Sequence, residues 1–252
     1  MPSLTRRKLL VNSGALAATT IEAAVAAEAT APIARPLKVL VAGGHPDDPE
    51  SSCGGTIAKY AGQGHNVSVL YLTCGERGII GKTRAETGAI RTAEAEHACR
   101  IMGAKPIFAG QVNGAVEVTR ERYAEYLKFV EAENPDVIFT HWPIDSHYDH
   151  AACSVLTYNA WLKLGCKAAL YYFEVNLGGQ TSSFHPTHYI DVTAQETVKR
   201  DACFAHVSQN APNDFWPKYH EPMLRFRGME SRCKAAEAFV RHNLGPEGRL
   251  PV

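Results

Sequence analysis

Two short clusters of histidine and aspartate contain the side chains of this sequence that are best suited to catalysis. They consist of His45, Asp47 and Asp48 in the first cluster and His147, Asp149 and His150 in the second. Positions i and i+3 of a helical turn share a face, so His45 and Asp48 are expected to point the same way. The two histidines of the second cluster have the same spacing. Two histidines and one carboxylate that leave an open position are typical of a catalytic zinc site.

A metal site of this kind predicts hydrolytic chemistry. A divalent metal lowers the pKa of a water molecule to about 7, and a neighbouring base must then accept the proton. Asp47 is adjacent to an expected ligand but points elsewhere, which favours it as that base. Amide hydrolysis also requires stabilisation of an oxyanion. We expect His147, held by Asp149 or Asp145, to do this as an imidazolium and then to protonate the leaving amine.

The elements that must position both clusters are short apolar strands alternating with longer helical stretches. The expected strands are 37–42, 66–73, 106–109, 136–141, 171–175 and 188–192, and the expected helices are 51–61, 82–102, 119–133, 149–164 and 193–206. Mostly apolar strands separated by helices indicate a parallel sheet covered on both faces. We therefore predict one doubly wound, Rossmann-like α/β domain with a mostly parallel sheet. Ligands of such folds bind at the carboxyl ends of the strands, and each cluster follows a strand there.

Two other histidines are expected to be structural. His141 ends a predicted strand and is interpreted as a supporting group, not as a fourth ligand. His97 lies inside a predicted helix and is expected to pack in the core.

The N-terminal residues have the pattern of an export signal. Arg6 and Arg7 precede a mildly apolar stretch, and residues 24–26 (Ala-Val-Ala) fit a small-x-small cleavage site. The order of these features predicts a twin-arginine-type signal peptide at 1–29, a linker at 30–36 and the folded domain at 37–252. We therefore expect the protein to be exported, either to the periplasm or out of the cell.

Composition excludes several classes of protein. Apolar residues make up 45% and charged residues 21% of the 252 residues, which excludes a wholly disordered chain. The 26 Lys+Arg balance the 26 Asp+Glu, and this lack of a basic excess argues against nucleic acid as a partner. No apolar stretch is long enough to insert into a membrane after processing. Seven cysteines without a C-x-x-C pair argue against a zinc knuckle or a disulfide scaffold.

The two clusters, taken with further motifs, resemble the PIG-L/LmbE family of zinc-dependent N-acetylglucosaminyl deacetylases. The motifs that carry the resemblance are His45-Pro46-Asp47-Asp48, His147-x-Asp149-His150, Gly54-Gly55-Thr56, Thr73-Cys74-Gly75-Glu76, Arg91-x-x-Glu94, Phe184-His185-Pro186 and His206-x-Ser208-Gln209. They extend over most of the mature chain.

The resemblance implies a role for each site residue. It implies one zinc or other divalent ion per chain bound by His45, Asp48 and His150, with Asp47 as general base, His147 supporting the oxyanion, Asp149 orienting His147, and Arg91 and Asn113 binding substrate. The alternative for Arg91 is a solvated ion pair with Glu94. This sequence departs from the family at Pro49, where Glu is common, at Tyr148, where Pro is usual, and at Asn113, where Asp is common. Glu50, which follows Pro49, is expected to have no chemical role.

We therefore predict a metal-dependent hydrolase that deacetylates a small N-acetylated amino sugar or a related N-acyl glycoside. One alternative is a hydrolase of the same fold that acts on a non-sugar amide. The other is a carbohydrate-binding protein without turnover, which has no need for a spare carboxylate such as Asp47 beside the metal. The sequence does not indicate an oligomeric state.

Overall fold

The computed structural model describes residues 35–175, 179–210 and 214–251. Residues Leu37–Val252 form one compact unit. The expected signal peptide at 1–29, and residues 30–34 of the expected linker, lie outside the described residues. Within the described ranges, no helix combines the length and the apolar character needed to cross a membrane.

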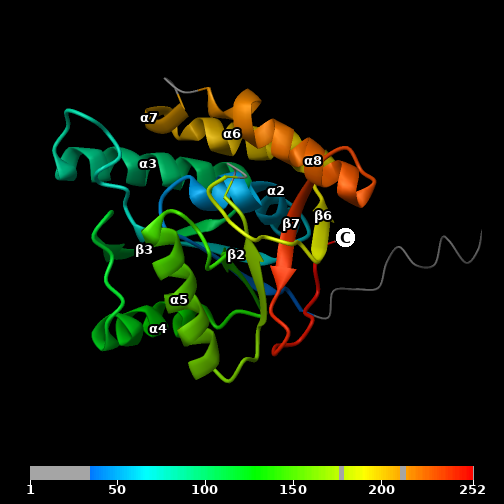
Figure 1. Cartoon of the computed structure of the whole chain (residues 1–252), viewed down its shortest axis with the longest axis horizontal. Helices are drawn as coiled ribbons and strands as arrows, with labels where there is room; N and C mark the ends of the chain where they lie inside the picture. The colour runs from blue at the N-terminus through cyan, green and yellow to red at the C-terminus, as the bar shows by residue number, and fades with distance from the viewer. Residues whose placement is uncertain (1–34, 176–178, 211–213, 252) are drawn as a thin grey trace, which may run out of the picture. The chain divides into compact units, whose positions relative to one another are not determined.

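Seven strands form a single sheet (Figure 1) in the order β3-β2-β1-β4-β5-β7-β6. Their bounds are β1 Lys38–Gly43, β2 Asn66–Thr73, β3 Lys105–Gln111, β4 Val137–His141, β5 Ala169–Phe173, β6 His188–Asp191 and β7 Ala236–Arg241. The first five strands pair in parallel, and β7 pairs antiparallel to both β5 and β6. The predicted doubly wound α/β domain with a mostly parallel sheet is confirmed.

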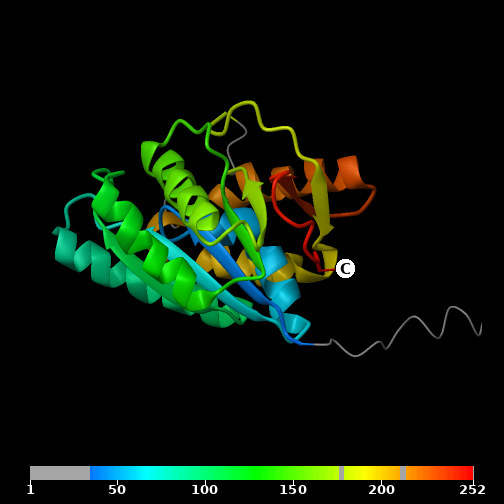
Figure 2. The ribbon, with the colours of Figure 1, turned by 90° about the horizontal axis from the view of Figure 1, so that it is seen from below.

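Helices cover both faces of this sheet (Figures 1 and 2), which is why the central strands are buried along nearly their whole length. The helices are α2 Asp48–Gly62, α3 Arg84–Met102, α4 Arg120–Glu133, α5 Tyr148–Lys163, α6 Glu196–Ala205, α7 Val207–Asn210 and α8 Glu221–Ser231, with a 3-10 turn η1 at Thr193–Gln195 and a π-helical turn η2 at Trp216–His220. Successive residues of a strand point to opposite faces. Val39 and Val41 of β1 accordingly pack in the core under α2, α3 and α6, whereas Leu40 and Ala42 pack in the core under α4 and α5.

The two histidine–aspartate clusters meet because of the strand order. β1 and β4 are neighbours in the sheet although about a hundred residues separate them, and Ala42 lies opposite Thr140. The chain proceeds from β1 toward β2 and β3 on one side, and from β4 toward β5 on the other. The point where the order reverses leaves a crevice beyond the carboxyl ends of the strands. The loops after β1 and after β4 border that crevice.

Some sequence predictions differ from the structure. The helix expected at 51–61 begins earlier, at Asp48, because Asp47 and Glu50 form a capping box at its start. His97 is exposed instead of packed in the core. The antiparallel strand β7 was not predicted, and it contains a buried charged residue, Glu237, which interrupts an apolar pattern. The helices at 216–231 were also missed.

Candidate active site

The loop between β1 and α2 approaches the start of α5 closely. A side chain at Gly44 would bring its Cβ within 3.0 Å of Cδ2 of His150, so glycine permits this approach. Asp47, the residue before α2, has a φ of 103°, which is unusual for a residue other than glycine. Its backbone N–H donates a hydrogen bond to Oε2 of Glu50 at 3.1 Å. Glu50, expected to have no chemical role, therefore fixes the backbone of the predicted base.

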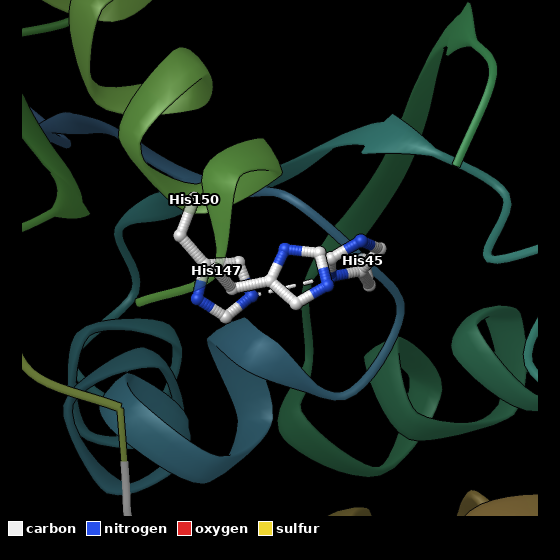
Figure 3. A group of neighbouring side chains, drawn as sticks. All are labelled: His45, His147 and His150. Carbon is white, nitrogen blue, oxygen red and sulfur yellow. Dashed lines mark hydrogen bonds between the residues drawn. The ribbon is translucent and has the colours of Figure 1, made fainter. Parts of the chain in front are cut away.

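Three side chains from the two clusters converge on one point. Nδ1 of His45 lies 3.1 Å from Oδ2 of Asp48, and Nε2 of His150 lies 3.2 Å from the same oxygen. The two ring nitrogens are themselves 3.2 Å apart. Figure 3 shows the rings of His45 and His150 brought together with that of His147. These distances suit a single small cation, because ligand atoms of a tetrahedral zinc with bonds of about 2.0–2.1 Å are roughly 3.3 Å apart.

Each of the two histidines is held through its other ring nitrogen. Nε2 of His45 lies 2.9 Å from Oδ2 of Asp149. Nδ1 of His150 lies 3.0 Å from the amide nitrogen of Gln180 and 3.3 Å from Oδ1 of Asp145. Partners of this kind orient the rings of metal-binding histidines.

The carboxylates also make the cluster favourable for positive charge. Burial lowers the pKa of His45, but Asp149 and Asp48 outweigh this effect and raise the value to about 9. Burial likewise lowers the pKa of His150, and Asp48 and Asp145 raise it to about 10. The pKa of Asp48 lies well below its usual value because nearby histidines outweigh its burial. A cation at this point is therefore electrostatically favoured.

His141 is close to this cluster but is already engaged. Its Nε2 accepts the backbone N–H of Gly44 at 2.9 Å and lies 3.4 Å from Oδ2 of Asp48. Burial lowers the pKa of His141 to about 4, so its ring is neutral. His141 forms a second possible ligand group with Asp48 and His150, and His147 forms another with the two central histidines. The Nε2 lone pair of His141 points at a backbone N–H, which fits the predicted supporting role.

Asp47 borders the cavity and is paired with a buried arginine. Nη2 of Arg91 lies 3.1 Å from Oδ2 of Asp47 and also donates to the carbonyl of Pro46. Arg91 is only 3% exposed. Its Nη1 donates to the carbonyl oxygen of Gly75 at 3.4 Å, and only glycine fits at position 75, because a Cβ would collide with the guanidinium. The alternative of a solvated pair between Arg91 and Glu94 is therefore wrong. Burial raises the pKa of Asp47, and Arg91 opposes that rise.

His147 precedes α5 and caps its first turn. Its Nδ1 accepts the backbone N–H of Asp149 at 3.2 Å. The neutral ring must therefore carry its proton on Nε2, and a proton on Nδ1 would oppose that N–H. The carboxylate of Asp149 contacts His45 and the backbone N–H of Gly114, not the ring of His147. The expectation that Asp149 orients His147 through its side chain, and that His147 is an imidazolium, does not match this geometry.

A cavity of about 420 Å³ opens over these groups. The predicted residues that line it are His45, Asp47, Asp48, Arg91, Asn113, His147 and His150, whereas Asp149 lies behind His45. Lining residues that sequence reasoning did not assign to the site include Ser51, Gln180, Asn210, Phe215, Tyr219 and His220. Most of these lie after residue 179, where the recognised motifs, at 184–186 and 206–209, do not include them.

Comparison with known proteins agrees with the resemblance seen in the motifs. Residues 40–161 match the family model PIG-L, described as GlcNAc-PI de-N-acetylase. The diacetylchitobiose deacetylase of Thermococcus kodakarensis is 30% identical over 202 residues, which cover 75% of each chain. The predicted family relationship is confirmed.

Solved structures share the fold over most of the chain. The N,N'-diacetylchitobiose deacetylase of Pyrococcus horikoshii superimposes with a TM-score of 0.72 at 24% identity, covering 83% of this chain and 87% of that one. The 4-carboxy-2-hydroxymuconate hydratase of Pseudomonas putida has the same TM-score of 0.72 at 22% identity, covering 83% and 97%. Because one fold serves both a deacetylase and a hydratase, the reaction must be argued from the site.

Proposed function

Because this chain belongs to the PIG-L family of de-N-acetylases, we propose that it is a metal-dependent hydrolase that removes the acetyl group from an N-acetylated amino sugar. The observation that carries the proposal is the group of three ligand atoms within 3.2 Å of one another, with Asp47 beside it in the same cavity. The Thermococcus relative is a diacetylchitobiose deacetylase, which supports the choice of substrate class.

The metal ligands in this proposal are His45, Asp48 and His150. Their donor set of two imidazoles and one carboxylate is typical of catalytic zinc, and other divalent metals also accept it. The close contact between the two ring nitrogens supports a shared cation, because without one a proton must lie between them. When bound, the ion acidifies a water molecule and polarises the acetyl carbonyl.

Asp47 acts as general base in this proposal. Its carboxylate accepts a proton from the attacking water as the water oxygen bonds to the acetyl carbon. As the C–N bond breaks, Asp47 returns that proton to the leaving amine nitrogen, so acetate and the amino sugar are the products. Burial raises the pKa of Asp47, which suits a group that both accepts and releases a proton. Arg91 and Glu50 hold it in its strained conformation.

His147 stabilises the negative charge that develops on the acetyl oxygen. The backbone N–H at its Nδ1 leaves the Nε2–H as the donor of the neutral ring. The same backbone contact holds the ring before the reaction begins, so little reorganisation is needed. In this account the neutral ring donates a hydrogen bond and transfers no proton.

Release of acetate tests the proposal. Purified protein is incubated with an N-acetylglucosamine glycoside, and free acetate is measured before chelation, after chelation and after addition of zinc. We expect acetate to be released, chelation to abolish the release, and zinc to restore it. Release that is unaffected by complete metal removal would contradict the proposal, as would a metal-loaded protein inactive on every N-acetylated amino sugar tested.

A matched variant separates catalysis from binding. Asp47→Asn changes the proposed base and leaves the proposed ligands intact. A carbohydrate-binding protein would bind the glycoside equally well with either residue and release no acetate with either. A hydrolase of a non-sugar amide would release acetate from simple N-acetylated amines and none from the glycoside.

We also propose, from the sequence, that the protein is exported by the twin-arginine route. The double change Arg6→Lys/Arg7→Lys should leave precursor in the cytoplasm with unchanged activity. N-terminal sequencing of the exported protein should find a start near Ala27 or Thr30. A native protein that still begins at residue 1 or 2 would contradict this proposal.

A further inference from the structure

The cavity has a second wall, which is chemically unlike the metal-binding end. It comes from α7, from Phe215 and from η2, a short segment near the C-terminus. The residues of this wall are Gln209, Asn210, Phe215, Tyr219 and His220. None of them has a role in the deacetylation proposed for the metal-binding end.

Two aromatic rings, those of Phe215 and Tyr219, belong to this wall. Phe215 and Tyr219 are four positions apart and therefore share a face of the helical turn. Their ring centroids are 5.8 Å apart with an angle of 44° between the rings. Tyr219 is 38% exposed, so its ring is accessible to a ligand in the cavity.

One ring of the pair contacts a buried residue, because the ring centroid of Phe215 lies 6.3 Å from that of His220, which is 8% exposed. Trp216, only 6% exposed, belongs to the core cluster under α2, α3 and α6. Its ring lies 6.0 Å from that of His220 and 6.4 Å from that of Phe204. A ring that is held in this way loses little conformational entropy when a ligand binds, so Phe215 is suited to stacking.

The polar groups around this wall are almost all neutral. Among the cavity-lining residues that the structure describes there is no lysine, and the one arginine, Arg91, is paired with Asp47. Besides the phenol of Tyr219, the remaining polar groups outside the metal-binding end are Ser51, Asn113, Gln180, Gln209, Asn210 and His220. Amides and hydroxyls can hydrogen-bond a hydroxyl group, whereas a buried phosphate or carboxylate here would lack a counter-charge.

We propose that this wall is a subsite for an uncharged pyranose ring, which stacks on Tyr219 and Phe215 while its hydroxyls meet the neighbouring amides. A pyranose has one face of C–H groups and a periphery of hydroxyls, which matches this combination of surfaces. This inference rests on the proposed function and narrows its substrate to neutral N-acetylated amino sugars. Tyr219 is then a residue that determines substrate specificity, and sugars bearing phosphate or carboxylate are disfavoured.

Binding of a sugar that cannot be deacetylated tests the subsite independently of turnover. Methyl glucoside has a pyranose ring but no amide, and calorimetry gives its Kd for the zinc-loaded protein. We expect Tyr219→Ala to raise this Kd roughly three- to tenfold, as for the loss of an aromatic contact, and Tyr219→Phe to leave it unchanged. Methyl glucoside 6-phosphate should bind more weakly than methyl glucoside to the wild-type protein.

The matched control is Phe226→Ala. Phe226 is an exposed ring on α8, 47% accessible, that does not line the cavity, so its removal should leave the Kd unchanged. Equal binding by wild type and Tyr219→Ala would overturn the subsite. So would undetectable binding of methyl glucoside to the wild type, or tighter binding of the phosphorylated sugar.

Kinetics then separates this inference from the proposed function. With an N-acetylglucosamine glycoside, Tyr219→Ala should raise KM without lowering kcat, and with acyclic N-acetylethanolamine it should change neither. An equal loss for both compounds would indicate a structural defect and overturn the subsite. If the wild type releases no acetate from either compound, the proposed function fails, while the Kd values still decide whether the wall binds sugars.

Discussion

Two buried groups of charged side chains in this domain differ in whether their charges are balanced within the protein. Lys199 and Glu237, each 2% exposed, form an ion pair with a distance of 2.5 Å between Nζ and Oε1. The carboxylate of Glu237 also accepts the backbone N–H groups of Gly55 and Thr56, at 2.9 and 2.7 Å. This pair is electrically balanced and its carboxylate is fully hydrogen-bonded, so it joins α2, α6 and β7 without needing a further partner.

The group at the carboxyl ends of β1 and β4 is not balanced in this way. Asp48, Asp145 and Asp149 surround two histidines whose nitrogens are directed at each other. When the histidines are neutral, each can donate one ring N–H to the carboxylate behind it, Asp149 or Asp145. The other nitrogen of each ring is then an acceptor that faces a further acceptor, Oδ2 of Asp48, so the cluster is completed by a cation. The difference teaches how to distinguish a structural charge pair from a functional one: the first is satisfied within the protein, and the second requires a ligand.

The largest effect is expected from loss of a proposed ligand. Asp48→Ala removes the oxygen that both histidines contact, so metal content should fall from about one ion per chain to near zero and activity should fall with it. Metal analysis of the purified variant, together with acetate release, checks this prediction. A variant that stays fully loaded with metal would show that Asp48 is not a ligand.

His147→Ala should keep the metal and lose rate. Losing one oxyanion donor typically costs roughly 10²–10³ in kcat. The control is His147→Gln, whose amide can restore part of the hydrogen bond and therefore part of the rate. Loss of metal from His147→Ala would instead identify His147 as a ligand, in the group that it forms with His45 and His150.

Asp149→Asn should weaken metal binding without abolishing it. Asp149 contacts His45 on the side away from the proposed metal, and removing such a supporting carboxylate typically costs about 10–100-fold in affinity or activity. Competition with a chelator of known affinity measures the change. An unchanged affinity would mean that the contact between Asp149 and His45 does not support the site.

Glu237→Gln should destabilise the fold and leave the chemistry intact. Removing one partner of a buried ion pair costs about 3–5 kcal/mol, because the other charge stays buried without compensation. Urea unfolding checks the free energy, and kcat at 25 °C should equal that of the wild type. The double change Lys199→Met/Glu237→Gln should recover much of the loss, and a double variant no more stable than the single one would contradict this account.

The features that could be predicted from the sequence are those that depend on local patterns of residues. Apolar strands such as residues 66–73 and the alternation with helices specify the sheet, and the rule for doubly wound sheets brings the clusters of His45 and His150 together. The ligand types and the spare carboxylate of Asp47 follow from residue chemistry. The family, too, was visible in these motifs.

Contacts between distant residues were beyond such reasoning. Asp149 lies two residues after His147 in the sequence, yet its carboxylate contacts His45. This contact forms because α5 packs against the loop after β1. The spacing of Arg91 and Glu94 allows an i,i+3 ion pair. In the structure the guanidinium lies beside Asp47 instead, because Gly75 has no side chain to block it. Phe215 and Tyr219 belong to none of the motifs, because their role depends on the placement of η2 beside the cavity.

The central claim, that two adjacent aspartates have different roles, is tested most directly by Asp47→Asn. Asn is nearly isosteric with Asp and tolerates a positive φ, so the turn at 103° should survive. We predict near-stoichiometric metal in the purified variant and a fall in kcat of roughly 10²–10⁴, as expected for loss of a general base. An empty metal site, or wild-type turnover, would contradict the assignment of Asp47 as base and Asp48 as ligand.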